Sequence, residues 1–277
     1  MKASQKSSLI ILILWESICH LTHVATLVTE DFEGDFGAQV FLFSDVYRSG
    51  SGQFVHDDLS GIANSPAGPQ IPIASGGDRE LRYFDGPEGT AGGHSMIVAP
   101  RTSSYSDSLI TGYLGNAFVS PRGGMMGGLM SRVTGVGANR SGYAAVAFFH
   151  AFGPDTVYFA LADMHDGNIG VNPSFSISGG SYGLDLSEEN IYAELLTEGD
   201  LIRASFWRVS PDGDQHFLES LTASDDTYRE GANGLVAFVR GQNSILFDDV
   251  SVLQIPEPSS SLLLILSFVP ILQRQRL

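Results

Sequence analysis

The sequence predicts an all-β protein, a jelly-roll β-sandwich of about a dozen strands. Its apolar runs are short, and clusters of glycine, proline, asparagine and aspartate separate them. No long stretch has the 3.6-residue period of an amphipathic helix. With 32 glycines in 277 residues, the chain has the composition of strands joined by many turns.

The strands are expected at intervals along the whole middle of the chain, wherever an apolar or alternating run lies between two turn signals. The segment 190–196 (NIYAELL) fits either a short helix or a further strand. The expected strands are residues 39–47, 80–84, 95–99, 108–114, 143–151, 156–162, 174–178, 201–209, 216–221, 235–240 and 245–253.

Residues 201–221 give the clearest local prediction, a β-hairpin. Ile202, Ala204 and Phe206 alternate with polar or larger residues before a Pro-Asp-Gly turn at 211–213 reverses the chain. Trp207 is the only tryptophan outside the first 25 residues. Two interpretations of it remain open, a ligand-binding ring that stacks on a sugar and a partly buried core residue.

Three segments are predicted to lie outside regular strands. Residues 86–94 and 122–130 are rich in glycine, which weakens strands, so each is expected to be a long connection or a loop over a binding face. Residues 161–170 contain Asp163, Asp166 and Asn168 but lack the spacing of a calcium loop, so an ordinary turn is expected there.

Residues 1–25 have the order of a cleavable secretory signal peptide. Lys2 and Lys6 precede an apolar run at 9–14, and a small residue, Ala25, ends the segment. A buried N-terminal helix is the alternative interpretation. The only cysteine, Cys19, lies in this segment, so the exported chain is expected to contain no disulfide.

Residues 255–277 differ in composition from everything before them. A Pro-Glu-Pro motif precedes an apolar run at 259–272 that is short for a membrane span, and basic residues follow it. The residues concerned are Pro256, Glu257, Pro258, Arg274 and Arg276.

This order of features resembles the PEP-CTERM sorting signal of exosortase substrates. The resemblance implies a sorting helix, export through the secretory translocon, transient contact with the inner membrane, and processing by an exosortase near Glu257. It also implies a Gram-negative bacterium that makes extracellular polysaccharide, and a place in the cell envelope or outside the cell.

Removing both ends leaves one predicted domain, residues 26–254. It carries 11 arginines, no lysine and 29 acidic residues, a formal charge of −18. Such a surface repels nucleic acid and anionic membranes and suits divalent cations or neutral partners. The alternative interpretation is that this negative charge only keeps the protein soluble.

Acidic residues lie beside strand residues at both ends of this domain. If the first and last strands are neighbours, Glu33 and Asp248, with the adjacent Asp249, could hold one Ca²⁺ together with backbone carbonyls. The segments Asp31-Phe32-Glu33 and 247–250 (FDDV) resemble those of jelly-roll carbohydrate-binding modules and concanavalin A-like domains. That resemblance implies a structural calcium that joins the termini. Without a metal, the two aspartates would start a turn or cap an edge strand.

Catalytic motifs are not found. At residues 198–203 an arginine, Arg203, stands where a retaining glycosidase on this fold would have its second glutamate. No Gly-x-Ser-x-Gly or His-Glu-x-x-His motif occurs. The expected function is therefore an exported, non-catalytic protein that binds or organises polysaccharide at the cell surface or in a biofilm matrix. The alternatives are a glycoside hydrolase or polysaccharide lyase with carboxylates far apart in sequence, and a structural surface protein without a small ligand.

Overall fold

The computed structural model describes residues 27–30, 45–48, 53–58, 79–84, 93–98, 104–117, 125–136, 139–149, 155–166, 168–169, 176–185, 189–239 and 244–255. Residues Leu27–Leu253 form one compact unit. The described residues contain 16 strands and no α-helix. The strands are β1 (Leu27–Glu30), β2 (Asp45–Arg48), β3 (Gln53–Asp58), β4 (Arg79–Phe84), β5 (Gly93–Val98), β6 (Ser108–Ala117), β7 (Met125–Thr134), β8 (Ser141–Phe149), β9 (Thr156–His165), β10 (Asn168–Ile169), β11 (Ser176–Gly183), β12 (Asn190–Glu198), β13 (Leu201–Val209), β14 (Gln215–Ser224), β15 (Ala232–Val239) and β16 (Ser244–Gln254).

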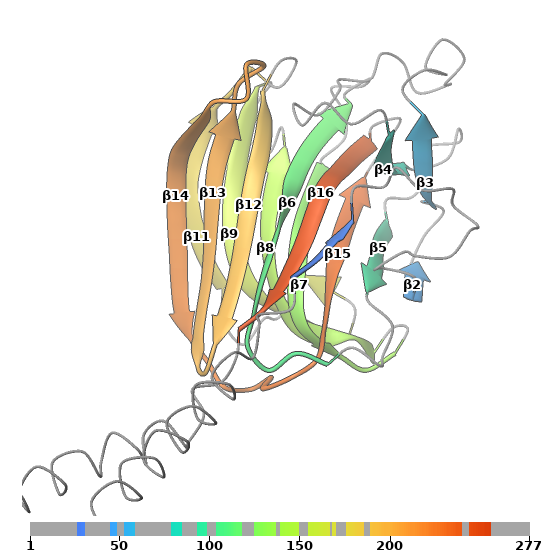
Figure 1. Cartoon of the computed structure of the whole chain (residues 1–277), viewed down its shortest axis with the longest axis vertical. Helices are drawn as coiled ribbons and strands as arrows, with labels where there is room; N and C mark the ends of the chain where they lie inside the picture. The colour runs from blue at the N-terminus through green and yellow to red at the C-terminus, as the bar shows by residue number, and fades with distance from the viewer. Residues whose placement is uncertain are drawn as a thin grey trace, which may run out of the picture. The chain divides into compact units, whose positions relative to one another are not determined.

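The strands form two antiparallel sheets, which confirms the predicted β-sandwich (Figure 1). Sheet A has eight strands in the order β14-β13-β12-β6-β16-β4-β3, with β1 also paired to β16. Sheet B has eight strands in the order β10-β9-β8-β7-β15-β5-β2, with β11 also paired to β9. Sequential hairpins alternate with connections between sheets, as expected for a jelly roll.

The core lies between the two sheets, where β6 and β12 of sheet A pack on β7 of sheet B. Phe206 of β13 and Phe159 of β9 are fully buried and stacked, with ring centroids 4.2 Å apart and planes 15° apart. Such offset aromatic pairs contribute beyond the apolar area they remove from water. This pair therefore joins the two sheets near β14.

The two sheets differ in what covers their outer faces. In β7 every residue from Met125 to Val133 is buried, and β8 is almost as completely buried, so both faces of sheet B are covered at these strands. In β12, buried residues alternate with half-buried ones, as in a strand with one face in the core and one toward solvent. The outer face of sheet A is therefore accessible at β12 and its neighbours.

The predicted hairpin at 201–221 is confirmed as β13 and β14, which pair from Leu201 opposite Ser224 to Val209 opposite Gln215. Gly213 in the turn has φ +85°, a conformation that glycine adopts without strain. The segment 190–196 is part of strand β12, so of the two predicted alternatives the strand is correct. Its alternation of Ile191, Ala193 and Leu195 with larger polar residues explains why.

The prediction that residues 122–130 cannot form a regular strand is wrong, because Met125–Thr134 is the central strand β7. A Cβ added to Gly127 would lie 2.7 Å from Ile245 Cγ2 of the facing sheet. A Cβ added to Gly128 would lie 2.7 Å from Val146 Cγ1 on the neighbouring strand. The glycines here allow close approach of backbone and side chains inside a crowded core. Of the segment 86–94, Gly93 and His94 belong to strand β5, and the rest lies outside the described residues.

The end of the expected strand 174–178 and the expected turn within residues 161–170 are also corrected. Gly179 and Gly180 lie within strand β11, at a shift of register between Ser178 and Ser181. The Gly180 N–H donates to Glu219 Oε2 of β14 at 2.7 Å, so this irregularity connects the edges of the two sheets. Asp163 lies in strand β9 and is buried, Asn168 belongs to strand β10, and the turn between these strands includes Asp166, with φ +47°.

Candidate functional site

Four aromatic side chains form a row across the outer face of sheet A. The strand register places Tyr192 of β12 between Tyr113 of β6 and Trp207 of β13, and Trp207 lies opposite Phe217 of β14. Successive ring centroids are 5.2, 5.7 and 5.7 Å apart. Since neighbouring strands are about 4.8 Å apart, the row extends about 14 Å across four strands. We call Tyr113, Tyr192, Trp207 and Phe217 the aromatic row.

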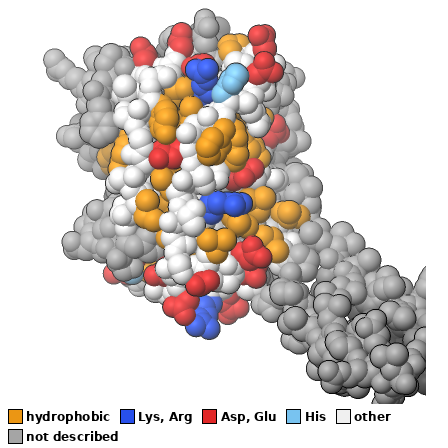
Figure 2. Space-filling model, turned by 90° about the vertical axis from the view of Figure 1, so that its left-hand side faces the viewer, with side chains coloured by type: hydrophobic (Ala, Val, Ile, Leu, Met, Phe, Trp, Pro, Cys, Tyr) orange, Lys and Arg blue, Asp and Glu red, His pale blue; other side chains and the backbone are white. Residues whose placement is uncertain are grey.

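The rings of the aromatic row are only partly covered. Phe217 is 60% exposed, and the other three are half-buried. Successive planes are tilted by 59°, 58° and 69°, so the row is a ridge of tilted rings and not one flat platform. Seen from the side of the molecule that is at the left of Figure 1, hydrophobic side chains lie among acidic and basic ones (Figure 2).

A β-bulge fixes the orientation of Trp207. The register between β13 and β14 shifts between Phe206, opposite Glu219, and Trp207, opposite Phe217, which leaves Leu218 as an extra residue in β14. Phe206 points into the core and Trp207 points outward, as alternation requires. The bulge re-aligns β14 so that Phe217 joins the aromatic row.

A polar row runs parallel to the aromatic row, one pleat further along the strands. The register places Glu194 of β12 between Thr111 of β6 and Ser205 of β13, and Ser205 opposite Ser220 of β14. The Ser205 and Ser220 hydroxyls are 3.1 Å apart, and Thr111 Oγ1 lies 2.7 Å from Ser251 Oγ. These four residues, the polar row, place hydroxyls and one carboxylate beside the exposed rings.

Glu194 carries the charge of the polar row. Burial raises the pKa of its carboxyl above the usual value, and the positive charge of Arg203 opposes this effect. Arg203 is exposed and lies one pleat further from the aromatic row, opposite Leu196. Thr111 and Ser205 are buried, so the polar row offers the half-buried Glu194 carboxylate and the exposed Ser220 hydroxyl beside the rings.

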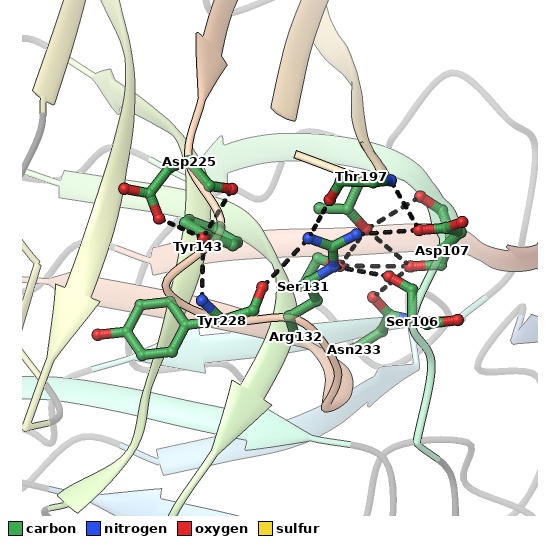
Figure 3. Close-up of polar contacts among 11 residues, drawn as sticks. Ser106, Asp107, Ser131, Arg132, Tyr143, Thr197, Asp225, Tyr228 and Asn233 are labelled. Carbon is green, nitrogen blue, oxygen red and sulfur yellow. Dashed lines mark hydrogen bonds and ion pairs between the residues drawn. The ribbon is translucent and has the colours of Figure 1, made fainter. Parts of the chain in front are cut away.

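Arg132 holds the turn that ends the β12–β13 hairpin (Figure 3). The guanidinium is 1% exposed and donates to the backbone oxygens of Ser106, Gly199 and Tyr228 at 2.6, 2.8 and 3.1 Å. It also donates to Asp107 Oδ1 at 3.0 Å, and the same oxygen accepts from the Gly199 N–H at 2.9 Å. Such charge-assisted bonds fix the hairpin that carries Tyr192 and Trp207.

Buried hydroxyls lie between the sheets next to Arg132. Ser131 Oγ lies 3.0 Å from Thr197 Oγ1, and Ser108 Oγ donates to Asn233 Oδ1 at 3.1 Å. Asn233 Nδ2 is buried and makes no hydrogen bond to the described protein atoms. An ordered water molecule is the usual partner of such a group. This polar cluster is buried between the sheets and belongs to the structural frame.

A chain of titratable groups lies where β9 meets the β14–β15 connection. His165 Nε2 is 2.7 Å from Asp163 Oδ2, and His165 Nδ1 is 2.9 Å from the Tyr228 hydroxyl. Burial, together with nearby carboxylates, raises the pKa of Tyr228. Burial and a 2.5 Å hydrogen bond to Asp225 raise the pKa of Tyr143. Raised phenol pKa values keep both tyrosines protonated near neutral pH, so neither supplies the phenolate that would act as a general base.

The predicted metal ligands are only partly described. The first and last strands are neighbours, since β1 pairs with β16 from Leu27 opposite Leu253 to Glu30 opposite Val250. Asp248 is 1% exposed and accepts from the Asp249 N–H at 2.8 Å, and Asp249 is exposed with φ +45°. Glu33 lies outside the described residues. No group of three or more metal-ligating side chains occurs among the residues that the structure describes.

The two ends of the chain with their targeting motifs lie outside the described residues. This holds for the predicted signal peptide, residues 1–25, and for Pro256, Glu257, Pro258, Arg274 and Arg276. Within the described ranges, no helix is long and apolar enough to cross a membrane.

Sequence reasoning singled out Trp207 but missed the residues around it. Tyr113 and Tyr192 belong to strands far apart in sequence, and their pairing became visible only with the sheet order. Phe217 joins them through the bulge in β14. The alternation within 190–198 was the only available signal that Tyr192 and Glu194 share an outward face.

The two sheets and their order define a jelly-roll sandwich of the kind found in lectin-like domains. The chain is similar to the exoplasmic/lumenal domain of VIP36 in its Ca²⁺/Man-bound form, with 9% identity and a TM-score of 0.50 over 84% of this chain and 91% of that domain. It is also similar to the carbohydrate-binding module CBM66 from Bacillus subtilis, with 17% identity and a TM-score of 0.39 over 73% and 95% of the two chains. A third similar structure is a legume lectin-like domain from Entamoeba histolytica, with 11% identity and a TM-score of 0.46 over 68% and 88%.

No family model and no curated protein matches this sequence. At these identities the likeness to solved structures establishes the fold alone.

Proposed function

We propose that this protein is exported and binds extracellular polysaccharide, without catalysing a reaction on it, through the outer face of sheet A. The aromatic row carries the proposal, because partly exposed rings from four adjacent strands are arranged in line on an accessible sheet face. The apolar faces of sugar rings pack on such side chains, while adjacent polar groups bind the hydroxyls. The row is longer than one sugar ring, which favours a chain over a monosaccharide.

Affinity gel electrophoresis of the full chain tests this proposal. Soluble polysaccharides of different backbone and charge are cast into native gels, and the mobility of the protein is compared with that in a polymer-free gel. At least one polymer is expected to retard the protein. Retardation by none, combined with calcium-dependent self-assembly in the absence of any glycan, would identify a purely structural surface protein instead. Release of reducing or unsaturated ends from a polymer would identify an enzyme.

The absence of catalysis is proposed because the titratable groups do not meet on the aromatic face. In the chain Asp163, His165 and Tyr228, the carboxylate is fully buried, and the His165 imidazole, 39% exposed, belongs to sheet B, whereas the aromatic row lies on sheet A. A glycosidase needs two carboxyls facing the same bond. On the aromatic face, Glu194 is the only carboxylate of the polar row.

A structural calcium is the second part of the proposal. The pairing of β1 with β16 supports it, because Glu30, the last residue of β1, lies opposite Val250, which directly follows Asp248 and Asp249 in β16. Glu33, Asp248 and Asp249 would contribute carboxylate oxygens and thereby join the first and last strands. The VIP36 domain of the same fold is a Ca²⁺/Man-bound form.

Removal of calcium is expected to lower the melting temperature of the full chain. A ligand at 100 times its Kd stabilises the native state by about 2.7 kcal/mol, which chelation would remove. Differential scanning fluorimetry with and without EGTA measures the shift. Asp248→Asn and Glu33→Gln are expected to abolish the calcium-dependent shift in melting temperature. Asp226→Asn, which removes a carboxylate from an exposed ion pair, should retain this shift. An identical melting temperature in calcium and in EGTA would contradict the proposed calcium site.

Export and C-terminal processing are the third part, supported by the order of motif, apolar run and arginines at residues 256–276. In cells with an exosortase, the mature protein is expected to lack both the first 25 residues and the segment after the Pro-Glu-Pro motif. Intact-mass measurement of the envelope and medium fractions checks this. Replacing Pro256, Glu257 and Pro258 by alanine should leave the C-terminal segment in place. A parent protein that keeps its full mass and remains in the cytoplasm would contradict export.

A further inference from the structure

Glu194 lies at the centre of the exposed part of sheet A. On its own strand it is two residues from Tyr192 and on the same face, so it lies about 7 Å from the aromatic row. Across the strands it faces Thr111 on one side and Ser205 on the other. A ligand lying along the aromatic row would therefore have Glu194 beside it, near the middle of its length.

The hydroxyls around Glu194 already have hydrogen-bond partners, whereas its carboxylate forms no hydrogen bond with the part of the chain that the structure describes. Ser205 is paired with Ser220, and Thr111 with Ser251. Among the described residues, no hydrogen bond to the Glu194 carboxylate is formed, and its interaction with Arg203 is a coulombic one. Burial already raises the pKa of this carboxyl, because the charged form is only partly solvated. A half-buried carboxylate without donors is an unfavourable arrangement that a ligand with hydroxyl groups would relieve.

The charge of the surroundings limits which ligand can supply those donors. Residues 26–254 have a formal charge of −18, and Glu194 is itself negative. Arg203 is an exposed cation on this face and lies on the far side of the polar row from the aromatic row. Arg208 lies 3.7 Å from Glu189 Oε1 and is partly neutralised by it. A chain of uronates or sulfated sugars would meet net repulsion here, whereas a neutral polyol would not.

We propose that the ligand is an uncharged polysaccharide, and that Glu194 is a specificity-determining residue that accepts hydrogen bonds from its sugar hydroxyls while the rings stack on the aromatic row. This inference rests on the proposed function and specifies the ligand class of the same face. Charge-assisted hydrogen bonds are roughly twice as strong as neutral ones. Glu194 would therefore set both the orientation of the sugar chain and part of its affinity.

The test compares the full-length parent with Glu194→Gln and a matched control, Glu198→Gln. Glu198 is an exposed glutamate at the end of the same strand, beyond the polar row. Affinity electrophoresis uses neutral polymers (xyloglucan, glucomannan and dextran) and uronate polymers (alginate and polygalacturonate), at low and high salt. The parent should be retarded by a neutral polymer independently of salt and not by the uronates. Glu194→Gln should weaken that binding about tenfold, and Glu198→Gln should not change it.

The possible results distinguish a failure of this inference from a failure of the proposed function. Equal retardation of Glu194→Gln and the parent by a neutral polymer would overturn the role of Glu194 but keep polysaccharide binding. Stronger, salt-sensitive retardation by the uronates would overturn the ligand class. Retardation of the parent by no polymer would overturn the proposed function, and this inference with it. Thermal melting of each variant verifies that the fold is intact, since substitution of a half-buried carboxylate without hydrogen bonds should not lower stability.

Discussion

Replacing Arg132 by methionine is expected to lower the free energy of unfolding by about 3–5 kcal/mol, the usual effect of removing one partner of a buried ion pair. The guanidinium makes four hydrogen bonds, and its loss leaves Asp107 without its cation and three backbone oxygens without a donor. Arg132 also has φ +52°, which the surrounding contacts must hold. Urea unfolding followed by circular dichroism measures the change.

The matched control for Arg132→Met is Arg229→Met. Arg229 forms an ion pair with Asp226 at 2.6 Å, but both side chains are largely exposed, so its loss should change stability by less than about 1 kcal/mol. Arg132→Lys is expected to be intermediate, because an ammonium cannot reach acceptors on both sides of the planar guanidinium. Equal urea midpoints for Arg132→Met and Arg229→Met would mean that the hydrogen bonds of Arg132 at the β12–β13 turn do not stabilise the fold.

The parts of the fold that were predictable from sequence are those with a local alternating or apolar pattern. In β13 the alternation of Ile202 and Ala204 with polar residues predicted the strand, and apolar runs predicted β8 and β15, whereas the pattern of β12 left a short helix open as an alternative. Strand β7 has no such clear signal, because glycines interrupt its apolar residues. Its glycines were interpreted as breakers of structure, although Gly127 is required by the close approach of Ile245.

The candidate site was less predictable than the fold because it depends on register. Trp207 stood out as the lone tryptophan of its domain, but nothing local indicates that Tyr113 lies two strands away from it. That relationship requires β6 to pair with β12, a non-local arrangement set by the whole topology. The position of Phe217 depends in addition on one extra residue in β14, and a shift by one residue would turn its ring to the other face.

The aromatic row is expected to contribute most of the affinity for polysaccharide. Truncation of an aromatic anchor at a binding surface commonly costs 2 kcal/mol or more, about a 30-fold loss. We therefore expect Trp207→Ala to weaken binding about 30-fold and the double variant Trp207→Ala/Phe217→Ala to abolish measurable retardation. A variant that begins at residue 26 contains Trp207 as its only tryptophan, because Trp15 lies within residues 1–25. Its fluorescence should shift on titration with the bound polymer, which gives an independent Kd.

Phe217→Ala separates binding from stability. Because Phe217 is 60% exposed at the end of the aromatic row, its removal should change the melting temperature little while weakening binding severalfold. Val136→Ala is the matched control, since among the described residues Val136 is the other exposed large apolar side chain, at 49%, and it lies after β7 outside the row. If Phe217→Ala bound polysaccharide as tightly as Val136→Ala and the parent, the aromatic row would only stabilise sheet A. Cross-strand aromatic pairs contribute about 0.2–1 kcal/mol each to the stability of a sheet. In that case Phe217→Ala would lower the free energy of unfolding by about this amount without weakening the binding of polysaccharide.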